Sequence, residues 1–264
     1  MSNCAFGLPT DNRALTGTLS ASAQIQPLDV SQLANDQGAT SRSWQTPVGT
    51  TAGWAQLDAG AAVAWDAVGL FNANLTPAAT VRVRFSGDPA FGTAIADSGV
   101  VAGLVAPGYR QAIHLPGSTV TARYVRVDIA DPGNPESCLR AAQLFAGTLR
   151  RPARNLGYDS RVQRAAERGE VRTRGGQSFF DLRHARRAWA ISLPSLAAAE
   201  VWPLVMEIQR ATEAGGNLLF LPFPAGADVA RDAVFGPLRD AAPVTFPSPT
   251  PRLRAWSATI EERL

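Results

Sequence analysis

The chain has 264 residues, of which 45% are hydrophobic and 18% charged, and its formal net charge is +3. These values are typical of a soluble globular protein with one large or two modest domains. No apolar run reaches membrane-spanning length and no signal-peptide pattern follows Met1, so we expect neither secretion nor membrane insertion.

The basic residues are unevenly distributed, and all 25 of them are arginines. Residues 150–187 contain eleven arginines and four acidic residues, a net charge of +7, whereas 1–149 and 188–264 each carry −2. Interleaved arginines favour contacts with acidic protein surfaces. Because no nucleic-acid-binding motif accompanies them, we do not expect nucleic acid as a partner.

The first half reads as short strands separated by turns. Alternating or apolar runs predict strands at 14–22, 54–58, 63–71, 81–85, 111–115 and 141–145. Gly60 is expected to end the second of these strands. Many short strands without a helical period predict a β-sandwich or jelly roll.

The clearest element is the segment 122–129, which alternates strictly. A period of two predicts a half-buried strand with one face in the core and the other in water. The expected inward residues are Val125, Val127 and Ile129, and the expected outward residues are Tyr124, Arg126 and Asp128. Large aromatics on strands usually anchor packing, so core positions are expected for Trp54, Trp65, Trp189 and Trp256.

The second half is expected to be an α+β domain, 177–264, joined to the first through an arginine-rich arm or linker at 150–176. Strands are predicted at 178–183, 189–193, 218–221, 232–236 and 256–260, which suggests an antiparallel sheet with one main helix. Ser195 is the expected N-cap of that helix. Its buried face would be formed by Val201, Leu204, Val205 and Ile208, and Pro203 implies either a kink or a later true start of the helix.

Several motifs of the first half occur in an order known from one family. They are Ala14–Gly17, Asn35–Gly38 followed by Trp44, Trp54–Gly60, Ala122–Val127 and Ala142–Phe145. Together these motifs resemble the discoidin, or coagulation-factor C-type, family of galactose-binding-like β-sandwiches. The resemblance implies that residues 1–149 form a jelly roll that binds a ligand through loops at one end.

The same resemblance implies candidate site residues. Asn35, Asp36, Arg42 and Trp44 lie on the matching loop, where they would hold a sugar, and Asn35 and Asp36 could ligate calcium. Gln143 stands where the family has an acidic residue, which weakens the calcium hypothesis. The alternative is a plain turn with Trp44 in the core. The family often has a cysteine near each end, which would pair Cys4 with Cys138; in a reducing compartment both would stay thiols.

The layout of the second half is similar to the carboxy-terminal part of minor tail and distal-tail-type proteins of tailed bacteriophages. This resemblance rests on 187–193, the helix, 216–222, 234–238 and 256–262. It implies a structural virion protein of a tail tip or baseplate. Such a protein would be assembled in the host cytoplasm as a homo-oligomeric ring with other tail subunits, and could touch a host surface glycan. The candidate subunit-contact residues are Arg150, Arg151, Arg154, Arg161, Arg164 and Arg168. The alternative is a carbohydrate-binding module or adhesin on an attachment domain.

Catalytic chemistry is not indicated. The two histidines, His114 and His184, have no metal-ligand spacing around them, and a strand histidine such as His114 is expected to be structural. There is no nucleophile elbow, phosphate-binding loop or paired-carboxylate motif. The sequence therefore predicts a protein that is not an enzyme and has no cofactor apart from the calcium hypothesis, although a site assembled from distant residues stays open.

Overall fold

The structure, a computed structural model, describes residues 3–246 and 252–263. It contains two compact units, which are Met1–Arg151 with Leu219–Ala233, and Pro152–Leu218 with Val234–Leu264. This division differs from the expected ranges 1–149, 150–176 and 177–264. The reason is that β15 (Asn217–Leu221) pairs with β1 (Ala5–Gly7) and so brings the segment after it into the first unit.

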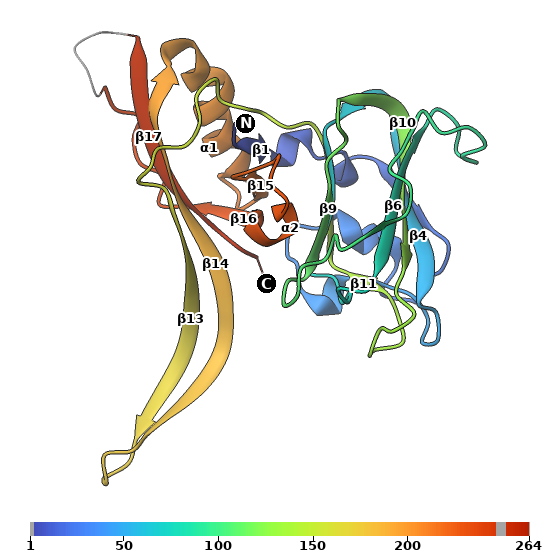
Figure 1. Ribbon diagram of the computed structural model, residues 1–264, viewed down its shortest axis with the longest axis horizontal. Helices are drawn as coiled ribbons and strands as arrows, with labels where there is room; N and C mark the ends of the chain where they lie inside the picture. Colours follow the sequence, from blue (N-terminus) through green and yellow to red (C-terminus); the bar gives the residue numbers. More distant parts are fainter. Residues whose placement is uncertain (1–2, 247–251, 264) are drawn as a thin grey trace. The chain divides into compact units, whose positions relative to one another are not determined.

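The first unit consists mainly of antiparallel strands (Figure 1). Its larger sheet has the order β2 (Thr18–Ala21), β4 (Ala52–Trp65), β10 (Val120–Ala130), β6 (Thr80–Ser86) and β7 (Ala96–Asp97), and β8 (Val101–Ala102) also pairs with β6. Its smaller sheet has the order β12 (Gln143–Gly147), β5 (Ala67–Phe71) and β9 (Gln111–His114). The unit also contains the pair β3 (Trp44–Gln45) and β11 (Arg140–Ala141) and the short helix α2 (Val229–Asp232). Four 3-10 turns lie at Pro9–Asp11, Arg13–Leu15, Val30–Ala34 and Thr40–Arg42.

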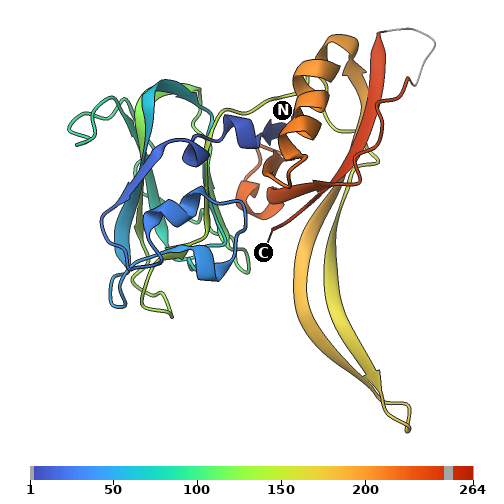
Figure 2. The same ribbon diagram turned by 180° about the vertical axis from the view of Figure 1, so that it is seen from behind.

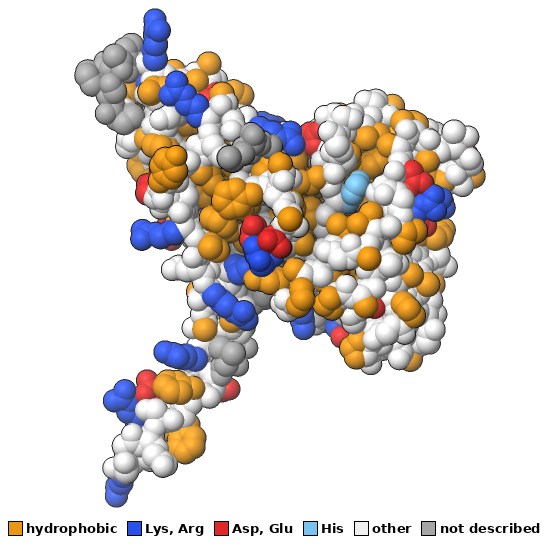
Figure 3. All heavy atoms as spheres, viewed as in Figure 1, with side chains coloured by type: hydrophobic (Ala, Val, Ile, Leu, Met, Phe, Trp, Pro, Cys, Tyr) orange, Lys and Arg blue, Asp and Glu red, His pale blue; other side chains and the backbone are white. Residues whose placement is uncertain are grey.

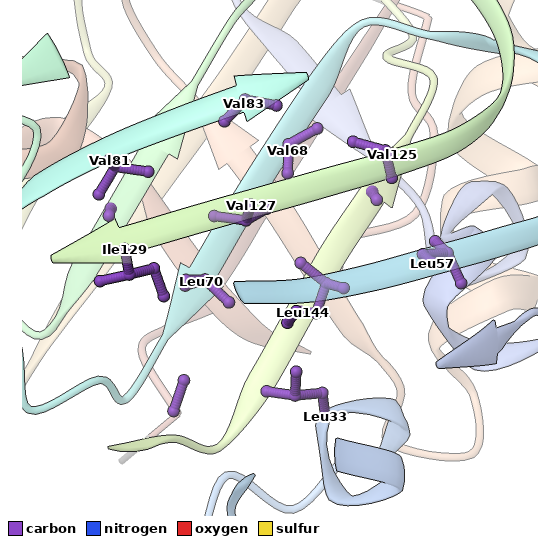
Figure 4. Close-up of a cluster of buried hydrophobic side chains, with 14 of the residues drawn as sticks. Leu33, Leu57, Val68, Leu70, Val81, Val83, Val125, Val127, Ile129 and Leu144 are labelled. Carbon is purple, nitrogen blue, oxygen red and sulfur yellow. The ribbon is translucent and has the colours of Figure 1, made fainter. Parts of the chain in front are cut away.

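Apolar side chains from both sheets fill the space between them (Figure 4). Val125, Val127 and Ile129 of β10 are at most 4% exposed and share one cluster with Val68 and Leu70 of β5. The inward face predicted for this strand is confirmed. The unit is therefore a β-sandwich whose core separates two antiparallel sheets.

The outward face of β10 differs from its prediction. Tyr124 is only 6% exposed, and the Arg126 guanidinium lies between two rings, 4.4 Å from the Trp54 centroid and 4.3 Å from that of Phe91. Arg126 Nε also donates to Gln56 Oε1 at 2.9 Å. Phe91 belongs to the loop after β6, and this loop covers a face that alternation alone placed in water.

The connection between the two sheets also differs from its prediction. β4 does not end at Gly60 but continues to Trp65, because Gly60 takes a φ of +78° that glycine tolerates within a bent strand. The run 63–71 was predicted as one strand. It is divided at Asp66, where the chain passes from the larger sheet into β5 of the smaller one.

The second unit is a sheet with one main helical segment. Its strand order is β16 (Val234–Arg239), β17 (Leu253–Glu261), β14 (Ser178–Ala197) and β13 (Arg161–Arg172). The helical segment consists of a 3-10 turn at Ala198–Glu200, a π turn at Val201–Met206 and α1 (Glu207–Thr212). The predicted fold class is confirmed, since the chain is mostly β with a sandwich and one main helical segment.

The start of that helical segment was predicted wrongly. Ser195 is not an N-cap, because β14 continues to Ala197 and the first turn begins at Ala198. Glu200 supplies the terminal contact instead, as its Oε2 accepts the Ala197 N–H at 2.8 Å. Pro203 lies in the π turn, which agrees with the expected irregularity at this residue.

The segment 150–176, predicted as an arm or linker, instead contains the strand β13. It pairs along its whole length with β14 through a turn at Thr173–Gln177, in which Gly176 has a φ of +82°. Beyond the part of β14 that pairs with β17, the two strands form a curved ribbon extending away from the rest of this unit (Figures 1 and 2). No helix among the described residues has both the length and the apolar character needed to cross a membrane.

Candidate functional site

The side chain of Asn35 holds together the loop that the resemblance assigned to ligand binding. Its Nδ2 donates to the carbonyl oxygens of Arg42 at 3.0 Å and Ala142 at 3.3 Å. Its Oδ1 accepts the backbone N–H groups of Gln37 at 2.8 Å and Gly38 at 3.2 Å. Both ends of the amide are thus used in fixing the loop itself.

Trp44 was wrongly assigned as a ligand-stacking residue. It is 0% exposed in the sandwich core, and its indole N–H donates to the Ala23 carbonyl at 3.0 Å. Asp36 and Arg42 are exposed on the same loop. With its aromatic side chain buried, the loop lacks the flat apolar surface that a sugar ring needs.

The calcium hypothesis fails on the donors that surround Asn35. Calcium takes about six to eight oxygen ligands, most of them carboxylate or carbonyl. Here Gln143 Nε2 donates to the Asn35 carbonyl at 3.0 Å, and Asn35 Oδ1 already accepts two N–H groups. No three His, Cys, Asp or Glu side chains of the described residues gather around one point. These residues do not fit calcium.

The candidate contact arginines fall into two groups. Arg150 is half-buried in the first unit, where its Nε donates to Asp11 Oδ2 at 2.8 Å and its backbone exchanges two hydrogen bonds with Phe6. Its guanidinium is already paired within the chain, and its role in subunit contact stays a prediction. The exposed arginines, whose role in subunit contact stays a prediction, are Arg151, Arg154, Arg161, Arg164 and Arg168.

The disulfide implied by the resemblance is not formed. Cys4 and Cys138 are both buried, and no bond joins them. Burial raises the pKa of the Cys138 thiol, which keeps it protonated and unreactive near neutral pH.

A hollow of about 270 Å³ opens elsewhere in the first unit, at the edge of the sandwich. Ala96 and Asp97 reach it from β7 and His114 from β9, and each of these strands is the last of its sheet. The full lining is Phe85, Ala96, Asp97, Ser98, His114, Pro116, Gly117, Ser118 and Val120. The hollow therefore combines an apolar floor and wall with four polar side chains.

His114 is the polar residue closest to the core. It borders both the hollow and a small void of about 10 Å³ between the sheets, and its imidazole has no hydrogen-bond partner among the described residues. Burial lowers the pKa of this imidazole below its ordinary 6.5. The ring is therefore neutral at physiological pH and offers one donor and one acceptor to whatever fills the hollow.

Asp97 and Ser98 form the opposite, rigid side of the hollow. Arg82 Nε donates to Asp97 Oδ1 at 2.9 Å, and this hydrogen bond is the main reason that the pKa of Asp97 falls to about 2. The Ser98 hydroxyl accepts the Val83 N–H at 2.9 Å and donates to the Gly99 carbonyl at 2.7 Å. Asp97 is thus an ionised acceptor that is held in place by its neighbours.

Sequence reasoning missed this site because no local motif marks it. Its polar residues come from the segments 97–98, 114 and 118, and only the packing of two sheet edges brings them together. The single available signal was a histidine at the end of the short strand Gln111–His114, for which the sequence predicts a structural role.

Comparisons with known proteins give likeness in structure alone, since no family profile and no curated protein matches the chain. The chain is similar to the lectin domain of lectinolysin complexed with Lewis B antigen, at 17% identity and a TM-score of 0.41, over 52% of this chain and 96% of that domain. It is also similar to chitosan-binding module 1 of a chitosanase/glucanase from Paenibacillus sp. IK-5, at 20% identity and a TM-score of 0.39, over 52% and 98% of the two chains. A third similar structure is a fucose-binding module of Streptococcus pneumoniae, at 16% identity and a TM-score of 0.40, over 52% and 94%.

Proposed function

We propose that the first unit is a carbohydrate-binding module that takes one sugar ring into the hollow beside His114. The carrying observation is the half-buried, neutral imidazole, which has no hydrogen-bond partner within 3–246 and 252–263 and lies in a hollow that also has apolar walls. A sugar ring offers hydroxyl groups for hydrogen bonds and C–H faces for apolar contact. The lining matches both, with His114, Asp97 and Ser118 for the hydroxyls and Val120 and Pro116 for the C–H faces.

Charge and size narrow the ligand class. Ionised Asp97 disfavours an anionic ligand, and it accepts hydrogen bonds from neutral hydroxyls. The volume of about 270 Å³ lies just below the range of about 300–1,000 Å³ for small-molecule pockets. The proposal is therefore a neutral monosaccharide unit, such as the end of a longer glycan, bound without catalysis.

The test is glycan binding by the full chain on an array that includes fucosylated glycans, Lewis B antigen and chitosan oligosaccharides. Replacing His114 by alanine should weaken binding about tenfold, because a lost hydrogen bond of this kind contributes about 1.4 kcal/mol. His184→Ala is the matched control, since His184 lies on the β13–β14 hairpin. An array without any bound glycan, or equal binding by His114→Ala, would contradict the proposal.

Binding should also depend on pH through His114. The pKa of His114 is lowered in the folded chain, so the unfolded chain takes up the proton more readily. The contribution of His114 to the free energy of unfolding is therefore complete above pH 6.5 and declines on acidification. Sugar binding should follow the same direction, constant above pH 6.5 and weaker once the imidazole is protonated. Calorimetric titrations across this range, with an NMR titration of His114, would check it; binding that strengthens on acidification would contradict it.

A structural role in a virion tail is the second candidate function. The observation that favours it is the exposed β13–β14 hairpin, which suits an assembly contact better than a sugar-binding role. In that case the second unit would attach the module to a particle assembled in the host cytoplasm. Co-purification of the chain with tail particles, tested by mass spectrometry of purified virions, would support this role over a free module.

A further inference from the structure

The outer part of the β13–β14 hairpin, residues 166–182, exposes the apolar side chains of Val171, Phe179 and Phe180, which do not stabilise an isolated two-stranded ribbon. Every residue from 170 to 181 is exposed, and Val171, Phe179 and Phe180 are 68%, 59% and 57% exposed. Hydrophobic, basic and acidic side chains all appear along this ribbon (Figure 3). Exposed apolar patches of this kind often indicate an interaction surface.

The backbone of β13 is also available for an interaction, through the outer edge of the strand. The strand is twelve residues long, pairs with β14 on one side and is the last strand of its sheet on the other. Proteins usually protect such an edge with proline, with charged side chains such as lysine, with a bulge or with a short strand. β13 has no proline or lysine and is not short, so its protection comes from its arginines and glutamates and from the irregular pairing between Glu167 and Arg168. Because a two-stranded ribbon is only marginally stable in water, pairing of this edge with a further strand would stabilise it.

The charges of the outer hairpin argue for a partner like itself. Residues 166–182 contain three arginines and three acidic residues, so this part is neutral although 150–187 carries +7. At the base of the hairpin, Arg186 and Arg187 are paired with Glu261 and Glu262. A polyanion would find no net positive charge on the outer part, whereas a second, identical ribbon offers both signs in alternation.

A twofold axis through Gly169 makes the two edges complementary. In antiparallel pairing about this residue, Arg168 lies opposite Glu170 of the second copy, and Glu170 lies opposite that copy's Arg168. Both residues share a face with Phe180, which pairs with Glu170 and whose ring centroid is 4.8 Å from the Arg168 guanidinium. Gly169 has no side chain, so the two strands can approach closely at the axis.

We propose that two copies of the chain pair through their β13 edges, antiparallel about Gly169, into a four-stranded sheet. The contact orders the hairpin and gives hydrogen-bond partners to the backbone groups at the outer edge of β13. It also brings the Phe180 rings of the two copies onto one face. This inference does not depend on the sugar site, which lies in the other unit.

The test is the mass of the full chain, measured by light scattering on a sizing column over a concentration series. We expect twice the chain mass of 27.9 kDa. Glu170→Arg and Arg168→Glu each place like charges opposite one another twice, and each should weaken the dimer at least about tenfold. Mixing the two variants should restore dimers, because a chain with glutamate at both positions then faces a chain with arginine at both.

Glu213→Arg and Arg110→Glu make the same charge changes at exposed positions outside the hairpin and should leave the dimer intact. The mixing experiment separates a lost contact from a misfolded hairpin, since a misfolded variant would not pair. A monomeric wild-type chain, dimers that persist in both single variants, or a mixture that stays monomeric would each overturn the proposal. Retention of a monomeric wild-type chain on heparin would assign the hairpin to an anionic partner instead.

Discussion

Replacing Trp44 by alanine should lower the free energy of unfolding of the first unit by about 3–5 kcal/mol, as for other large buried aromatics. Trp44 is 0% exposed and packs in the sandwich core. The substitution leaves a cavity and removes the indole N–H that the Ala23 carbonyl accepts. Urea unfolding followed by circular dichroism measures the loss, and Trp44→Phe, which keeps a ring, should lose less.

Trp202→Ala is the matched control for this prediction. Trp202 is 77% exposed, so its removal should change stability by no more than about 0.5 kcal/mol. The Trp44→Ala result distinguishes a core residue from a sugar-stacking surface residue, because removal of a surface residue would not lower the free energy of unfolding by this amount. A Trp44→Ala variant that unfolds like the wild type yet loses glycan binding would return Trp44 to the ligand site.

Glu262→Gln should destabilise the second unit by about 3 kcal/mol, the lower end of the cost of breaking a buried ion pair. Glu262 Oε2 accepts the Arg187 Nε–H at 3.0 Å and the Arg187 backbone N–H at 3.1 Å. The side chains of Arg187 and Glu262 are only 9% and 19% exposed. Glutamine leaves the guanidinium buried beside a neutral group, which should accelerate amide exchange in β14 and β17.

The neighbouring Glu261 provides the control. It lies 3.5 Å from Arg186 and 3.6 Å from Arg239, and both arginine side chains are more than a third exposed. Solvent-exposed pairs of this length contribute less than about 1 kcal/mol, so Glu261→Gln should leave amide exchange nearly unchanged. Equal effects of the two substitutions would show that burial of the Arg187 pair does not control the stability of this sheet.

The two proposals assign separate tasks to the two units. The hollow beside His114 lies in the sandwich, and the hairpin edge belongs to the other unit. A dimer through β13 would present two sugar sites on one particle. Two weak sites that engage one glycan surface together bind far more tightly than either alone, provided that the geometry allows both to engage. Comparing binding to a glycan surface by the wild type and by Glu170→Arg would connect the two proposals.

Local patterns predicted the core of the sandwich well. The period of two in 122–129 identified Val125, Val127 and Ile129 as buried, because alternation follows directly from the geometry of a strand. The same pattern placed Arg126 on the outward face but gave no sign of the Trp54 and Phe91 rings that partly cover its guanidinium. The loop that covers an outward face comes from a distant part of the sequence. The alternation within one strand contains no information about that loop.

The sequence by itself determined the mostly β fold and the buried face of its clearest strand, since these depend on neighbours along the chain. Tertiary structure alone decided that Trp44 is core, that 161–172 is a strand rather than a linker, and that 219–233 belongs to the first unit. It also created the hollow, because Asp97, His114 and Ser118 meet only where two sheet edges pack. Each of these features depends on contacts between residues far apart in sequence, and no short stretch of the chain encodes such contacts.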